Sequence, residues 1–313
     1  MAATGGLTST CSIFFPTISM TTAIRPRRSA LYMPASNARA LEKARTLPAD
    51  VIILDLEDAV APDAKKTARE QAAAAIKARG FGPREVVLRT NGLDTAWIDE
   101  DLAAAVTAGP DAVLVPKISS PEEVAFVAHK LADLKAPSGL ALWAMIETPL
   151  GVLDANFIAA AGRDPKMRLV VLVLGTNDIA KETRARIVPG RLPMLAALST
   201  VILAARAHGL DVLDGVFNDI QDTAGFAREC EDGRNLGFDG KTLIHPSQVE
   251  PCNAAYSPAE AEVAQAKKIV AAFATPENAG KGVITVDGRM VELLHAEIAR
   301  RTVALHDAIA ARA

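Results

Sequence analysis

Short apolar runs that end in polar residues alternate along the chain with longer alanine-rich stretches of helical periodicity. Continuous apolar runs are typical of parallel strands that are buried on both faces. Eight β-α units of this length favour an α/β fold of the closed (β/α)8 barrel (TIM barrel) type. The candidate strands are residues 29–34, 51–58, 85–91, 112–117, 140–147, 169–178, 210–217 and 241–246.

A doubly wound open sheet is the alternative architecture for the same pattern. No GxGxxG follows the first candidate strand, which weakens the dinucleotide-binding version of that fold. We expect the barrel domain to occupy residues 25–256. Residues 257–313 have a helical pattern beyond the eighth strand and are expected to form a C-terminal helical extension.

Residues 1–24 are rich in Thr, Ser and Ala and are expected to be a disordered leader without function. Their apolar patch, Ile13-Phe14-Phe15, follows no positively charged segment, and the arginines of a transit peptide are missing. An over-extended start, with Met20 as the initiator, is the other interpretation.

Composition and charge narrow the class of protein. The 313 residues are 50% hydrophobic and carry a net charge of −3, so no basic field points to nucleic acid or to an anionic membrane. No apolar run approaches the roughly 20 residues that span a bilayer. The three cysteines lack disulfide or zinc spacing, which favours a reducing cytoplasm.

Charged residues gather where the candidate strands end. Active sites of (β/α)8 barrels lie at this end of the strands, and a charge next to a buried strand is unfavourable unless it is paired or binds a ligand. For Asp55 and Lys117, an ion pair at the barrel mouth and a role in an active site both remain open. We interpret His245 as a structural residue. The set is Asp55, Glu57, Asp58, Arg89, Lys117, Glu147, Asp178 and His245.

Two of these carboxylates end neighbouring candidate strands. Glu147 and Asp178 are one β-α unit apart and would present hard oxygen ligands side by side. Mg²⁺ suits such a pair, because it keeps several waters and takes further oxygens from a substrate. Sugar and keto-acid barrels also carry paired carboxylates, so the spacing alone leaves metal binding open.

Together with these features, seven motifs resemble the HpcH/HpaI aldolase superfamily, and within it the citrate lyase β-subunit-like CoA-ester lyases. They are LYMP at 31–34, LDLEDAV at 54–60, LRTN at 88–91, PK at 116–117, IET at 146–148, GTND at 175–178 and GFDGKTLIHP at 237–246. The segments 175–182, 203–210, 214–218 and 286–295 are most similar to the malyl-CoA thioesterase-like branch.

The resemblance implies roles for the residues at the barrel mouth. It implies that Glu147 and Asp178 hold Mg²⁺, for which Mn²⁺ can substitute, and that Glu147 and Arg89 belong to the substrate-binding set. Arg89 would bind the substrate carboxylate or enolate oxygen, since a guanidinium aimed at developing charge stabilises an enolate. Glu57 and Asp58 would orient the metal waters or the catalytic partners.

The resemblance also implies a CoA site and a shared active site. Arg39 and Lys43, four residues apart on one face of a starting helix, would receive the CoA phosphates. The C-terminal extension would be a lid that closes the active site of a neighbouring subunit in a homo-oligomer, a trimer or a hexamer. Its acid/base is Glu292 here, where the similar lyases carry Asp, and that departure questions the lyase step.

Three functions are therefore compared. The first is a Mg²⁺-dependent lyase or thioesterase that acts on a small 3-hydroxy-acyl-CoA such as malyl-CoA or citramalyl-CoA through an enolate. The second is a pyruvate-forming aldolase for a hydroxy-oxo-acid without CoA, which needs neither Arg39 and Lys43 nor Glu292. The third is a non-catalytic subunit of a larger lyase complex.

Overall fold

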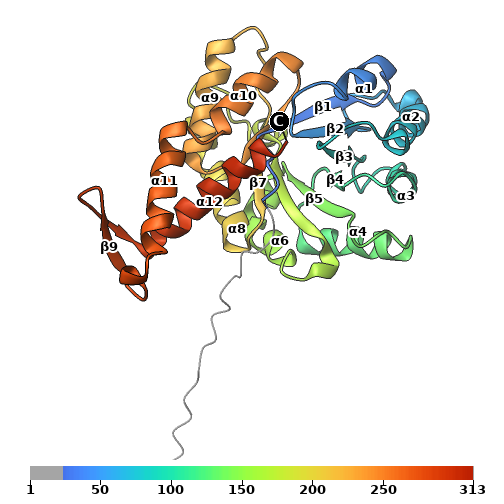
Figure 1. Cartoon of the computed structure of the whole chain (residues 1–313). Helices are drawn as coiled ribbons and strands as arrows, with labels where there is room; N and C mark the ends of the chain where they lie inside the picture. Colours follow the sequence, from blue (N-terminus) through green and yellow to red (C-terminus); the bar gives the residue numbers. More distant parts are fainter. Residues whose placement is uncertain (1–23, 313) are drawn as a thin grey trace, which may run out of the picture.

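The computed structural model describes residues 24–312, so the expected leader lies outside the described residues except for Ile24. Strands β1 to β8 form a closed parallel barrel in sequence order, with helices around it (Figure 1). The ring closes where Ser29 of β1 pairs with Lys241 of β8. This confirms the predicted (β/α)8 barrel, and the open-sheet alternative is wrong.

All eight predicted strands are present, although most are shorter than expected. Their bounds are β1 Ser29–Pro34, β2 Val51–Asp55, β3 Glu85–Arg89, β4 Ala112–Val115, β5 Ala141–Ile146, β6 Leu169–Leu174, β7 Asp211–Asp214 and β8 Gly240–Leu243.

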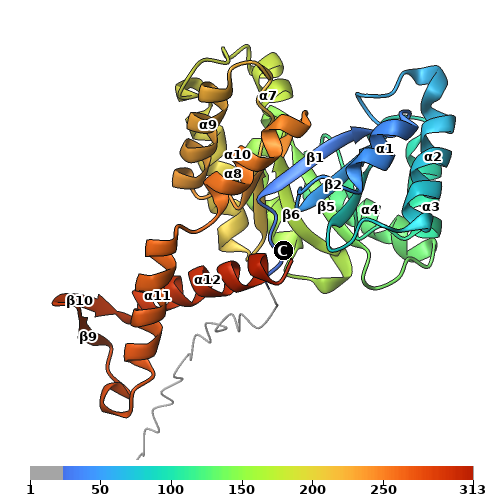
Figure 2. The ribbon, with the colours of Figure 1, turned by 45° about the horizontal axis from the view of Figure 1, so that its top comes forward.

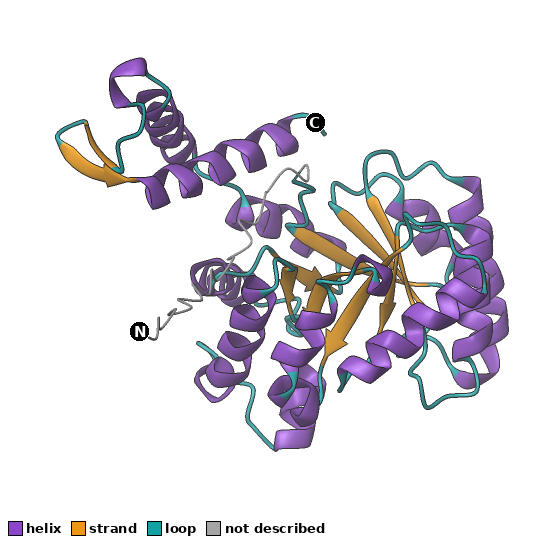
Figure 3. Cartoon of the chain, turned by 90° about the horizontal axis from the view of Figure 1, so that it is seen from below, coloured by secondary structure: helices purple, strands orange, loops and turns teal. Residues whose placement is uncertain are grey.

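The helices that follow the strands surround the barrel (Figures 1 and 3). No helix among residues 24–312 is long and apolar enough to cross a membrane. The bounds are α1 Ala38–Ala44, α2 Lys65–Ala78, α3 Ile98–Ala108, α4 Pro121–Asp133, α5 Pro149–Leu153, α6 Ala155–Ala161, α7 Thr176–Thr183, α8 Leu195–Ala207, α9 Thr223–Leu236 and α10 Val249–Tyr256.

Two strand ends differ from the prediction for identifiable reasons. β2 stops at Asp55 because the Asp55 carboxylate accepts hydrogen bonds from the N–H groups of Glu57, at 2.9 Å, and Ala59, at 3.2 Å. Such side-chain bonds form a turn and compete with strand pairing. Asp178 was expected to end a strand, but β6 stops at Leu174 and Asp178 lies in the first turn of α7.

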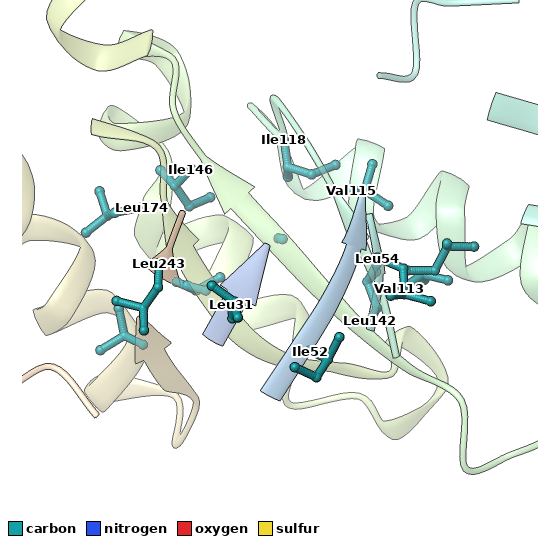
Figure 4. Close-up of a cluster of buried hydrophobic side chains, with 14 of the residues drawn as sticks. Leu31, Ile52, Leu54, Val113, Val115, Ile118, Leu142, Ile146, Leu174 and Leu243 are labelled. Carbon is teal, nitrogen blue, oxygen red and sulfur yellow. The ribbon is translucent and has the colours of Figure 1, made fainter. Parts of the chain in front are cut away.

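Alternate residues of strands β1 to β7 enter two separate cores. Ile52 and Leu54 of β2 point outward and pack with helix residues, in the layer drawn in Figure 4. Val51 and Ile53 belong to a cluster made of strand residues only, which fills the barrel interior. By the same alternation, the next interior position of β2 is Asp55, at the carboxyl end of the strand.

The C-terminal segment leaves the barrel as an arm, defined here as residues 260–310, with α11 (Glu260–Phe273), β9 (Val283–Val286), β10 (Arg289–Glu292) and α12 (Leu293–Ala310). The prediction of an all-helical extension is wrong. β9 and β10 form an antiparallel hairpin around Asp287 and Gly288, which both have positive φ. An Asp-Gly pair between alternating apolar residues is a strong hairpin signal.

The arm is attached at the end of the barrel opposite to the strand carboxyl ends. Arg312, after α12, donates hydrogen bonds to the carbonyls of Pro26 and Pro83, which precede β1 and β3. Arg301 of α12 pairs with Asp239, just before β8. The β9–β10 hairpin lies at the outer end of the arm, away from the barrel (Figure 2).

Candidate active site

A cavity of about 360 Å³ opens at the carboxyl ends of the barrel strands. The alternation along the strands places Tyr32, Asp55 and Arg89 on the interior side of the barrel, one interior position beyond the last apolar layer. Glu147, directly after β5, continues the same alternation. Asp55 and Arg89 are direct partners in the β2–β3 register. The lining comprises Tyr32, Pro34, Asp55, Asp58, Ala59, Arg89, Met145, Glu147, Leu174, Gly175, Thr176, Asn177, Asp178, Val216, Asn218, Thr242 and Ile244.

Arg89 is a buried cation held by carboxylates. Its Nε and Nη2 donate to the two oxygens of Asp55 at 2.6 and 2.7 Å, in the bidentate geometry that guanidinium favours. Tyr32 lies under the guanidinium, with 4.7 Å from Cζ to the ring centre. Burial alone lowers the pKa of Arg89, but the charge and hydrogen bonds of Asp55 outweigh it and raise this pKa above its usual value.

Glu57 links Arg89 to Lys117. Its Oε1 accepts a hydrogen bond of 2.8 Å from the Lys117 amine, and its Oε2 lies 2.7 Å from Arg89 Nη1. No donor is aligned with Oε2 among the described residues, so the Arg89 contact is an ion pair rather than a directed hydrogen bond. Glu57 and Lys117 line a neighbouring cavity of about 390 Å³, and Asp58 lies on the wall shared by both cavities.

Glu147 is fixed on two sides. Its Oε1 accepts the backbone N–H of Lys117 at 2.9 Å, and its side chain packs directly against Gly175. A Cβ at Gly175 would overlap Oε2 and lie 2.5 Å from the Glu147 Cβ. Burial first, and then the negative charges of Glu57 and Asp178, raise the pKa of Glu147 to about 8.

Asp178 lies on the same cavity as Glu147 and is less constrained. The amine nearest to it is that of Lys181, at 3.7 Å, and its side chain is 24% exposed. Residues 24–312 contain no group of three or more metal-ligating side chains, so an ion here would have two protein carboxylates and otherwise water or substrate oxygens. Two hard ligands, one of them a buried carboxylate with a raised pKa, fit a hard divalent cation.

The remaining predicted site residues lie outside this cavity. Arg39 and Lys43 are both on α1, exposed, and in no ion pair with another described residue. Glu292 lies at the junction of β10 and α12, on the arm, and its N–H donates to His295. Because the arm is attached at the other end of the barrel, Glu292 is remote from the cavity of its own chain (Figure 2).

Some residues of the cavity were given no role by the sequence interpretation. Tyr32 and Gly175 stand inside recognised motifs, but their contacts depend on the three-dimensional arrangement. Asn177 and Asn218 exchange two amide hydrogen bonds, of 3.1 and 2.8 Å, across the mouth of the cavity. Nothing in the local sequence pairs these two segments.

The closed barrel and the charged cavity at its mouth define an enzyme of the (β/α)8 class, in which catalytic residues come from the ends of several strands. A family profile described as HpcH/HpaI aldolase/citrate lyase matches residues 28–246, which include every barrel strand. The chain belongs to this family, as the resemblance indicated.

Individual relatives agree with that assignment. The chain is 49% identical over 286 residues to the (3S)-malyl-CoA thioesterase of Cereibacter sphaeroides (strain KD131 / KCTC 12085). The matched region covers 91% of this chain and 96% of that protein. It is 34% identical over 273 residues to citrate lyase subunit beta of Escherichia coli (strain K12), and that match covers 86% of this chain and 89% of the E. coli protein.

Among solved structures, the protein CitE from Mycobacterium tuberculosis in complex with magnesium, acetoacetate and coenzyme A matches with a TM-score of 0.68 and 32% identity. The match covers 89% of this chain and 97% of that chain.

Proposed function

We propose that the protein is a Mg²⁺-dependent enzyme that cleaves or hydrolyses the CoA thioester of a small 3-hydroxy acid of the malyl-CoA or citramalyl-CoA type. The observation that carries the proposal is the convergence of one buried cation, Arg89, and two carboxylates, Glu147 and Asp178, on one cavity. The thioesterase and citrate lyase relatives and the magnesium and coenzyme A in the CitE structure support it.

The reaction places negative charge on the thioester oxygen. In the lyase direction the 3-hydroxyl loses its proton, the C2–C3 bond breaks, and its electron pair forms an enolate that is protonated at C2. When bound by Glu147 and Asp178, Mg²⁺ would supply electrostatic stabilisation of that charge. Mn²⁺ has similar oxygen ligand preferences and should substitute.

Arg89 is a protein group that is suited to stabilise the same negative charge. A guanidinium has five N–H donors; two are directed to Asp55 and one, over 3.5 Å, to Asp58, so not every donor is occupied by these partners. The bidentate Asp55 pair fixes its orientation before substrate binds, so little reorganisation is needed as charge develops. Glu57 and Asp58 keep the guanidinium in place, and Asp58 remains at the cavity rim.

Product analysis tests the proposal directly. The purified protein is incubated with malyl-CoA and Mg²⁺, and the products are separated. Glyoxylate with acetyl-CoA identifies a lyase, and malate with free CoA identifies a thioesterase. Turnover of a free hydroxy-oxo-acid to pyruvate instead would favour the CoA-independent aldolase. Absence of turnover together with co-purification of a stoichiometric partner would favour a non-catalytic subunit.

We assign the CoA phosphates to Arg39 and Lys43, because both are exposed on α1 without an ion-pair partner among the described residues. The double variant Arg39→Ala/Lys43→Ala is expected to raise KM for the CoA ester roughly 10- to 100-fold, the value of one or two charge-assisted hydrogen bonds. Its kcat should hardly change, because contacts remote from the reacting carbon bind ground and transition states alike.

Steady-state kinetics check this assignment. The matched control is Lys77→Ala/Lys166→Ala, which removes the same charge from exposed residues at the opposite end of the barrel. An unchanged KM in the Arg39/Lys43 variant would place the CoA site elsewhere.

Gly175→Ala is expected to disable the site without unfolding the barrel. The new methyl group would overlap the Glu147 carboxylate, and misplacement of a catalytic group by about 1 Å can reduce the rate about 10²-fold. Mg²⁺ affinity and kcat are measured together with the thermal midpoint. Gly139→Ala is the control, because a Cβ there meets nothing within 4 Å. Equal kinetics in the two variants would contradict the described packing of Glu147.

We infer that the arm is a lid that contributes Glu292 to the active site of a neighbouring copy, in a homo-oligomer such as a trimer or a hexamer. Glu292 is remote from its own cavity, and five large apolar side chains of the arm are exposed. A second copy would cover that surface and bring the carboxylate to a barrel mouth. The exposed large apolar residues of the arm are Val283, Met290, Leu293, Leu294 and Ile298.

A cytoplasmic location of the protein stays a prediction.

A further inference from the structure

Lys117 combines an unusual backbone conformation with contacts to Glu147, a proposed metal ligand, and to Glu57, which lies beside Arg89. It follows β4 and Pro116, is 39% exposed at its side chain, and has a φ of 56°, in the left-handed region that a residue with a Cβ rarely adopts. Strained residues of this kind persist where the surrounding structure holds them, and they concentrate at functional sites.

The backbone of Lys117 serves the metal side of the site. Its N–H donates to Glu147 Oε1 at 2.9 Å, and the next N–H, that of Ile118, donates to the carbonyl of Met145 at 3.1 Å. The left-handed turn therefore directs two successive N–H groups to the end of β5. With Gly175 on the other side, it leaves the Glu147 carboxylate little freedom.

The side chain of Lys117 serves the arginine side. Its amine donates to Glu57 Oε1 at 2.8 Å, and Glu57 Oε2 lies 2.7 Å from Arg89. Asp58 also lies 3.5 Å from Arg89, so the three carboxylates and two cations of this group carry a formal charge of −1. Without the amine, the group would have a formal charge of −2, and the field of Arg89 on an anionic substrate would weaken.

We propose that Lys117 is a positioning residue with two separable actions: its backbone fixes Glu147 for the metal, and its amine fixes Glu57 so that Arg89 keeps its place and its field. The inference rests on the proposed function. The simpler interpretation, a lysine that only stabilises the barrel mouth, predicts a change in stability and none in the kinetic constants.

Four variants of Lys117 separate the two actions. Lys117→Met and Lys117→Gly remove the amine and tolerate the left-handed backbone, whereas Lys117→Val removes the amine and resists that backbone because it is β-branched. Lys117→Arg keeps a cation. Each is compared with wild type for binding of Mg²⁺ alone by calorimetry, for kcat and KM with malyl-CoA, and for thermal midpoint.

We expect the Met, Gly and Val variants to lose about 10- to 100-fold in kcat/KM, as is typical when a partner of an active-site group is removed, and the Arg variant to recover part of it. Mg²⁺ affinity should stay near the wild-type value in the Met and Gly variants and fall about 10-fold or more in the Val variant. Lys117→Thr, also β-branched, replaces the Val variant if that fails to fold.

Lys135 provides the control. It also has a positive φ, of 59°, and follows α4 away from the cavity. Lys135→Val should lower the thermal midpoint, Lys135→Met should leave it near the wild-type value, and both should leave Mg²⁺ affinity and kcat/KM unchanged.

The outcomes separate the inference from the function. Wild-type kcat/KM in Lys117→Met would overturn the action of the amine, and equal Mg²⁺ affinity in the Val and Met variants would overturn the action of the backbone. A wild-type protein that does not bind Mg²⁺, or a Glu147→Gln variant that binds it as wild type does, would overturn the proposed function and the inference with it.

Discussion

Asp178→Asn is expected to reduce Mg²⁺ affinity and kcat by more than roughly 10²-fold while the barrel stays folded, because losing a direct ligand should exceed the loss seen for an outer partner. Asp178 is partly exposed in the first turn of α7 and takes part in no buried ion pair with another residue of 24–312. The amide keeps the size of the side chain but removes its negative charge and one of its two oxygens. The stability of the fold should therefore depend little on the Asp178 carboxylate, whereas Mg²⁺ binding should depend on it strongly.

The measurement combines calorimetric Mg²⁺ binding with turnover of malyl-CoA. Glu182→Gln is the matched control, since Glu182 is exposed on the same helix and is in no ion pair with another described residue. EDTA should abolish wild-type activity, and Mg²⁺ or Mn²⁺ should restore it. Full activity of the metal-stripped enzyme would refute the role of Glu147 and Asp178 as metal ligands.

The barrel was predictable because its signal is distributed along the chain. Several strands, such as Val51–Asp55, are apolar runs long enough to be recognised alone, and the alternation that sends Val51 inward and Ile52 outward repeats in strands β1 to β7. The strand ends were not predictable. β2 stops where the Asp55 side chain bonds to the next backbone amides, and β6 stops at Leu174. Glu57 and Asp58 therefore lie in a turn after β2, and Asp178 lies at the start of α7.

The hairpin of the arm was missed for a different reason. Asp287 and Gly288, which follow the β-branched run Val283–Val286, are a usable hairpin signal, but the helical pattern of the rest of the segment outweighs it. Glu292 ends β10 of this hairpin.

The sequence could select candidate site residues but not their connections. Arg89 and Glu147 could be selected because charge at the end of a barrel strand indicates a site, and Asp178 because it follows such a strand closely, although it lies on α7. The roles of all three stay predictions. For Asp55 and Lys117 the sequence left two interpretations open. The structure pairs both, Asp55 with Arg89 and Lys117 with Glu57, while each also borders a cavity. These pairings join segments more than 30 residues apart, which no local pattern encodes.

Glu292→Gln is expected to lower kcat about 10²- to 10⁴-fold, the usual contribution of general acid–base catalysis. The amide keeps the size and hydrogen bonding of the side chain and cannot exchange a proton. Glu297→Gln, on the exposed face of α12 one turn further along, is the control and should behave as wild type. Near wild-type turnover of the Glu292→Gln enzyme would remove the catalytic role.

Mixing two inactive variants tests whether the site is shared. In an oligomer of Glu292→Gln and Asp178→Asn chains, some cavities combine an intact barrel of the first variant with an intact arm of the second. For random mixing in a head-to-tail ring, about a quarter of the sites are complete, so about a quarter of wild-type activity should return after subunit exchange. No recovery after verified exchange would mean that Glu292 does not act on a neighbouring barrel.

Glu292→Asp addresses the choice between C–C cleavage and hydrolysis. Similar lyases carry Asp where this chain has Glu292, and one methylene can move a carboxylate by about 1 Å, enough to change which bond the group serves. A shorter side chain should favour proton transfer to the enolate carbon, whereas the longer one can place a water against the thioester carbonyl. The ratio of glyoxylate to malate is therefore expected to rise in Glu292→Asp, with Glu297→Asp as the control. An unchanged ratio would mean that side-chain length at this position does not select the reaction, whatever the Gln variant shows about proton transfer.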